Sequence, residues 1–230
     1  MRDTDVKFFV KGNSDIVDAA LSTADGGAKI DRGVKELVNS GFPHVTVHVS
    51  HEASARFSAL RTELESGTSL LIDEQPDIVL LSIVDDIREF GDDVAGTEHA
   101  VDEIETNLVA VVNLIKEKVG AHVFIANAST LDPAQELFNY HDLSEEPASL
   151  RAQRLDLMLI GVSHSEGISI IDVDRKIAEL GGAKGVTAAF DYSAAGCQTI
   201  AAEIVRVMED YGFFDDRQLL AQVGARAGVK

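Results

Sequence analysis

The chain has 230 residues, of which 45% are hydrophobic, and a formal net charge of −19 from 39 acidic and 20 basic residues. This length and apolar content fit one α/β domain with a substantial core, and they exclude wholesale disorder. A surface this acidic repels phosphate groups, so we expect neither nucleic acid nor a membrane as a partner.

Three features of the sequence bear on the cellular compartment: its cysteine content, its first residues and the length of its apolar runs. Cys197 is the only cysteine, which excludes an internal disulfide and a zinc ribbon. The polar start of the sequence does not resemble a signal peptide, and no run approaches the ~20 apolar residues that span a bilayer. We therefore expect a reduced, cytoplasmic protein.

Five apolar runs predict strands, and segments with helical periodicity separate them. The strands are expected at 6–10, 45–49, 78–84, 122–126 and 168–171. The helices are expected at 30–38, 101–119, 150–160 and 200–211. This alternation predicts a three-layer α/β/α sandwich around a five-stranded parallel sheet. Residues 1–212 are expected to form this single domain, and 213–230 a docking helix and tail.

Polar residues follow each predicted strand. In a parallel sheet the carboxyl ends of the strands share one edge, where ligands collect. Ser14 follows the first strand and suits either a nucleophile or a helix N-cap. The other residues expected at this edge are Gly12, Asn13, His51, Glu52, Asp85, Asp86, Asn127, Asp172 and Asp174.

Two further features bear on the site. The stretch 127–147, which contains His141, has weak periodicity, and a loop of that length is typical of a site lid. His44, His48 and His51 have a spacing that would suit metal binding on a helix, but their context is a strand. The aspartates at the strand ends, Asp85, Asp86, Asp172 and Asp174, could hold a hard cation, but we interpret them as helix N-caps and solvated acids. No metal and no cofactor are expected.

Three segments of this sequence resemble sequence blocks of the SGNH (GDSL-type) hydrolase family, and the resemblance covers residues 6–211. The family's first block is a strand followed by Gly-Asp-Ser, where this chain has Gly12-Asn13-Ser14. Its third block is a buried strand followed by Gly-x-Asn-Asp, which 76–87 matches in shape. Its last block is Asp-x-x-His before the final helix, and here Ala188 to Asp191 take that place.

The resemblance implies a flavodoxin-like strand order of 2-1-3-4-5 and a hydrolase that acts on an ester, thioester or related acyl substrate. Ser14 would be the nucleophile. The family's histidine is replaced by Asp191 and its aspartate by Ala188. Asp85 replaces the asparagine that stabilises the oxyanion, and a carboxylate there repels an oxyanion unless it is protonated.

Several assignments stay open from the sequence. His51, with His141 as a second candidate, could replace the missing base, or His51 could be a surface residue. Gly12, Asn13, Asp86 and Asn127, with Asp85 and His141, are candidates for binding the substrate or the oxyanion. The alternatives to a hydrolase are a non-catalytic binding or scaffold protein, and an enzyme that uses the carboxylates of Asp15, Asp85 and Asp191. Homo-oligomerisation is left open.

Overall fold

The computed structural model describes residues 4–12, 30–53, 56–88, 97–131, 148–188 and 190–215. A five-stranded sheet with the order β2-β1-β3-β4-β5 forms its centre, and all its neighbouring strands are parallel. The strands are β1 (Thr4–Gly12), β2 (Val45–Ala53), β3 (Ile78–Ser82), β4 (His122–Ala126) and β5 (Ser169–Ile171). The fold class and the strand order predicted from the sequence are therefore confirmed.

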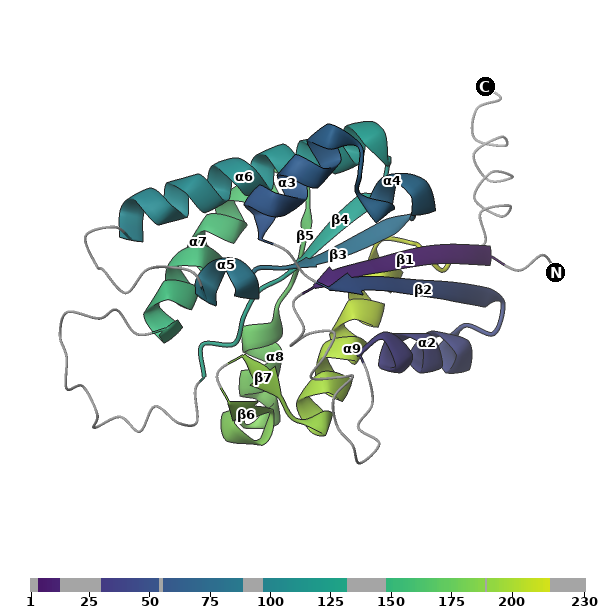
Figure 1. Ribbon diagram of the computed structural model, residues 1–230. Coiled ribbons are helices and arrows are strands. Elements are labelled where there is room, and N and C mark those ends of the chain that lie inside the picture. Colours follow the sequence, from purple (N-terminus) through teal and green to yellow (C-terminus); the bar gives the residue numbers. More distant parts are fainter. Residues whose placement is uncertain are drawn as a thin grey trace, which may run out of the picture.

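Helices cover both faces of the sheet (Figure 1). One face packs against α2 (Ile30–Gly41), α8 (Val173–Leu180) and α9 (Ala194–Asp210). The other packs against α3 (Phe57–Ser66), α6 (Thr97–Lys118) and α7 (Ala148–Glu166), and short helices α4 (Leu70–Glu74) and α5 (Val84–Arg88) flank β3. Among the described helices, none is both long and apolar enough to cross a membrane.

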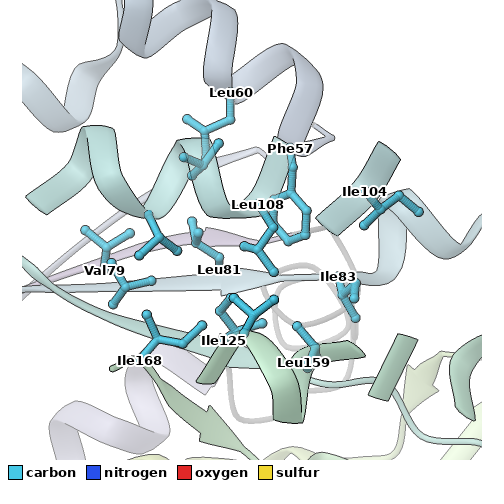
Figure 2. Close-up of a cluster of buried hydrophobic side chains, with 14 of the residues drawn as sticks. Phe57, Leu60, Val79, Leu81, Ile83, Ile104, Leu108, Ile125, Leu159 and Ile168 are labelled. Atoms are coloured by element: carbon cyan, nitrogen blue, oxygen red, sulfur yellow. The ribbon is translucent and has the colours of Figure 1, made fainter. Parts of the chain in front are cut away.

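Two buried clusters, one on each face, hold these layers together. Side chains alternate between the faces along β1, so that Phe8 and Val10 enter the cluster under α2 and α9, and Phe9 enters the other. Figure 2 shows the second cluster, in which Phe57 and Leu60 of α3 and Leu108 of α6 cover the sheet. Burial of this apolar surface is the main force that fixes the sheet edge described below.

Some elements differ from the sequence predictions. β2 continues to Ala53, because each of its nine residues pairs with β1, so Ser50, His51 and Glu52 lie within the strand and not beyond it. β3 ends earlier, at Ser82, whose hydroxyl accepts a hydrogen bond from the Val84 N–H at the start of α5. The short helices α3, α4, α5 and α8 were not predicted, and neither was a two-stranded antiparallel hairpin, β6 (Val186–Ala188) and β7 (Asp191–Tyr192).

Candidate functional site

The candidate site lies at the carboxyl edge of the sheet, where β1, β2, β3 and β4 end together because they are parallel. Gly12 is the last residue of β1. Asn13, Ser14 and His141 lie outside the described residues. Whether Ser14 is a nucleophile or a helix cap therefore stays a prediction. The resemblance also leads us to expect that Ser14, Asp85 and Asp191 lie close together at this edge, and this stays a prediction as well.

Asp86 is one of two adjacent carboxyls that follow β3 in the first turn of α5. Its side chain is buried, and both of its oxygens lie 3.3 Å from the backbone nitrogen of Phe57, the first residue of α3. Burial, with a smaller contribution from the neighbouring Asp85, raises the pKa of this carboxyl to about 7. Asp86 thus joins α5 to the start of α3, while Asp85 beside it is half-buried.

His51 lies in β2 opposite Val10, and its side chain is exposed. The next residue, Glu52, takes part in a contact that the sequence analysis missed. The ammonium of Lys11, on β1, lies 2.8 Å from the Glu52 carboxylate and 2.5 Å from that of Glu63 on α3. Lys11 is only 3% exposed. The sequence feature that could have indicated a buried lysine is its position, directly after the apolar run 8–10 and directly before Gly12.

Asn127, directly after β4, is almost fully buried and uses its whole side-chain amide. Its oxygen accepts hydrogen bonds from the backbone of Val173 (2.6 Å) and Asp174 (3.3 Å) at the start of α8. Its nitrogen donates to the carboxylates of Asp156 (3.4 Å) and Asp172 (3.3 Å). In this arrangement Asn127 links β4, α7 and α8, and both of its N–H groups are already engaged.

A cavity of about 500 Å³ lies beside Asn127, between α7, α8 and α9. Asp156 lines it, and burial, with repulsion from Asp174 and Asp172, raises the pKa of Asp156 to about 8. One oxygen of this carboxyl is buried without a hydrogen-bond partner among the described residues. Asp172 also accepts a hydrogen bond from the Arg175 N–H and is the N-cap of α8, as the sequence predicted.

Asp191 lies in the β6–β7 hairpin, directly opposite Ala188. The residues on either side of it are anchored. Phe190 is buried in the cluster under α3 and α6, with a left-handed backbone (φ 63°), and Tyr192 is buried in the cluster on the other face. The Tyr192 hydroxyl accepts a hydrogen bond from the Ser129 N–H at 3.3 Å. The hairpin is therefore held next to the end of β4.

No group of three or more His, Cys, Asp or Glu side chains is placed to hold a metal ion in the part of the chain that the structure describes. His44, His48 and His51, the three histidines in and next to β2, do not form such a group. His44 contacts the Phe214 carbonyl oxygen through Nε2, and His48 lies 3.5 Å from the Asp5 carboxylate. His48 and His51 are three residues apart on one strand, so their side chains point to opposite faces.

Two solved structures illustrate the proteins to which this architecture is similar. The acetylxylan esterase Axe2 from Geobacillus stearothermophilus superposes with a TM-score of 0.65 and 16% identity, over 94% of this chain and 98% of that one. A member of the lipolytic protein G-D-S-L family from Veillonella parvula DSM 2008 gives a TM-score of 0.61 and 15% identity, over 88% and 98%. The chain therefore has the fold of the SGNH (GDSL-type) hydrolases, as its sequence blocks predicted.

The sequence comparisons gave no match, either to a protein-family model or to a curated protein. Among the similar structures are catalytic mutants of Axe2 in which a serine, an aspartate or a histidine is replaced by alanine. At this level of identity the likeness establishes the fold, and the chemistry has to be argued from the residues of this chain.

Proposed function

We propose that this protein is an SGNH-like hydrolase that acts on an ester, thioester or related acyl substrate through Ser14, with altered base and oxyanion residues. The observation that carries the proposal is the position of Gly12. It ends β1, which lies inside the sheet between β2 and β3, in a fold shared over 94% of the chain with an acetylxylan esterase. Ser14 follows two residues later in the sequence.

The same likeness suggests which substrates to test first. Axe2 is an esterase of acetylated xylan, so small acyl esters are the first substrates to test. An acyl-transfer mechanism would use the Ser14 hydroxyl as the nucleophile and needs a group that accepts its proton.

Proton transfer is where this chain departs from the family. Asp191 stands at the position of the family's histidine, and a carboxylate is a weaker base than an imidazole, so it accepts the proton of a serine hydroxyl poorly. Asp85, at the position of the oxyanion-stabilising asparagine, would repel the developing charge. Each lost oxyanion donor typically costs about 10²–10³ in kcat, so we expect slow hydrolysis of simple esters.

Serine-directed labelling tests this proposal. The parent protein, Ser14→Ala and the control Ser40→Ala would be treated with a fluorophosphonate and assayed with short acyl nitrophenyl esters. Ser40 lies exposed near the end of α2, and its hydroxyl donates a hydrogen bond to the Leu37 carbonyl oxygen. We expect slow labelling and slow hydrolysis in the parent and in the control, and neither in Ser14→Ala. A folded parent that is neither labelled nor active would overturn the hydrolase proposal.

The replaced residues favour a second candidate function, that of a binding or scaffold protein that retains the cleft without a working triad. Ala188 and Asp191 occupy the positions of the family's aspartate and histidine, so neither member of the usual base pair is present there. An enzyme that uses Asp15, Asp85 and Asp191 as acid–base groups is the remaining alternative. Absence of labelling together with saturable ligand binding would support the binding protein.

A further inference from the structure

Lys11 is a cation buried at the carboxyl end of the strand that leads to the proposed nucleophile. Transfer of an ammonium group out of water is costly unless the charge is paired. Here two carboxylates pair with it, Glu52 from β2 at 2.8 Å and Glu63 from α3 at 2.5 Å. Its strand neighbour on the other side is Leu81 of β3, so the charge sits inside the sheet's edge and not on the surface.

Helix α3 has a second polar connection to the same edge. Its first residue, Phe57, donates its backbone N–H to Asp86 after β3, and Glu63, two turns later, contacts Lys11 of β1. Figure 2 shows Phe57 and Leu60 of α3 directed toward the sheet. Through these contacts one helix fixes the ends of β1, β2 and β3 relative to one another.

We propose that Lys11 is a positioning residue for the site. Its ammonium group holds the last residues of β1, up to Gly12, against Glu52 of β2 and Glu63 of α3. This inference rests on the proposed function, in which Ser14 follows Gly12. Lys11 is not proposed as the missing base, because its Nζ is already engaged by two carboxylates, those of Glu52 and Glu63.

Two variants that replace a charged side chain by an uncharged one, each with a matched control, test the inference. Lys11→Met removes the cation of the Lys11–Glu63 ion pair, and Glu63→Gln removes its anion. Lys7→Met changes a lysine on the same face of β1 that is exposed, and Glu65→Gln changes an exposed carboxylate of α3 that pairs with Arg61. For each protein we would measure the saturating rate and half-saturating concentration of fluorophosphonate labelling, and the hydrogen exchange of peptides that cover the end of β1 and, separately, β3.

We expect the saturating labelling rate to fall about tenfold or more in Lys11→Met, and by a smaller factor in Glu63→Gln, with an unchanged half-saturating concentration. Amide exchange should rise at the end of β1 and stay unchanged in β3, whereas the controls behave like the parent. Unchanged exchange at the end of β1 in both test variants, or an equal rise throughout the sheet, would overturn the inference. If Lys11→Met does not fold, Glu63→Gln decides alone.

The hydrogen-exchange measurement tests the role of Lys11 independently of the proposed function. A parent that is not labelled would overturn the hydrolase proposal, and the exchange of the β1 peptide would still decide whether Lys11 holds the end of the strand. A rise in exchange without any labelling would assign Lys11 the same positioning role in a binding cleft.

Discussion

The carboxyl group of Asp86 and the backbone N–H of Phe57 join two helices that follow different strands. Both carboxyl oxygens lie 3.3 Å from that nitrogen. The start of a helix carries partial positive charge, which favours a carboxylate there, yet burial favours the neutral acid. Burial is the larger effect, since the pKa of Asp86 is raised to about 7. The buried carboxyl group of Asp86 therefore binds and releases its proton near neutral pH.

Replacement of Asp86 by asparagine should flatten the dependence of stability on pH. The folded-state pKa is raised to about 7 from an ordinary value of 3.8. Folding thus favours the protonated acid, and the stability that this contributes is complete below about pH 4 and lost as the pH rises through 7. Urea unfolding at about pH 5 and pH 8 should show a smaller decrease for Asp86→Asn than for the parent. Asp102→Asn, at an exposed site on α6, should keep the parent's decrease, and equal decreases in all three proteins would contradict the prediction.

Asp156→Asn should stabilise the protein at alkaline pH. The pKa of Asp156 is raised to about 8 by burial and by Asp174 and Asp172, so the parent loses stability as the pH rises from about 4 through 8. An asparagine is neutral throughout and its oxygen can still accept the hydrogen bond from Asn127. We expect a gain of about 1–3 kcal/mol in the free energy of unfolding near pH 9, and little change near pH 4. A variant that is less stable than the parent at both pH values would show that the carboxylate is stabilised by contacts other than those described.

The same substitution should have opposite effects at two glycines. In Gly196→Ala, at the start of α9, the new Cβ would lie 2.1 Å from the Gly185 carbonyl oxygen, so the helix or the loop must move. Gly161 is exposed within α7, with no atom within 4 Å of the corresponding position. We expect Gly196→Ala to lose about 2–4 kcal/mol or to misfold, and Gly161→Ala to gain up to about 1 kcal/mol. Thermal and urea unfolding would measure both, and a stable Gly196→Ala variant would show that the close approach of α9 is not needed.

A restored catalytic pair is the sharpest test of the alignment of the last block. Ala188 and Asp191 are paired across the β6–β7 hairpin, and the Cα atoms of residues paired in this way lie about 4.5–5.5 Å apart. Ala188→Asp with Asp191→His would therefore place a carboxylate beside an imidazole, the arrangement that orients a histidine base. We expect faster fluorophosphonate labelling than in the parent, and loss of that labelling when Ser14→Ala is added. Asp191→Asn is the control for removal of the carboxylate, and labelling no faster than in Asp191→Asn would reject the alignment.

The repeating features of the sequence predicted the three-layer sandwich, and the resemblance to the SGNH family supplied the strand order. The apolar runs at 78–84 and 122–126 and the long stripe of α6 are strong periodic signals, and they gave the sheet and its largest helix. Helix α3 has only three buried apolar residues, Phe57, Leu60 and Leu64, and was missed because so short a pattern is weak.

The candidate site was less predictable, because its contacts join residues far apart in the chain. The ion pair between Lys11 and Glu63 spans 52 positions, and the bond from Asn127 to Val173 spans 46. The predicted strand ends indicate which residues lie at this edge of the sheet. They do not indicate which of these side chains already form hydrogen bonds within the protein. Asn127 and Asp86 were candidates for binding the substrate or the oxyanion, and the structure shows that both accept hydrogen bonds from backbone N–H groups at the starts of helices.

Phe190 and Tyr192 enter the cores on opposite faces of the sheet and leave Asp191 between them. Their burial offsets the cost of a left-handed phenylalanine, which is about 1 kcal/mol or more. The conformation of this segment is thus set by its aromatic neighbours and not by the residue at 191 itself. An exchange of the residue at 191 between aspartate and histidine is therefore expected to leave the backbone of the hairpin and the packing of its two aromatic side chains in place.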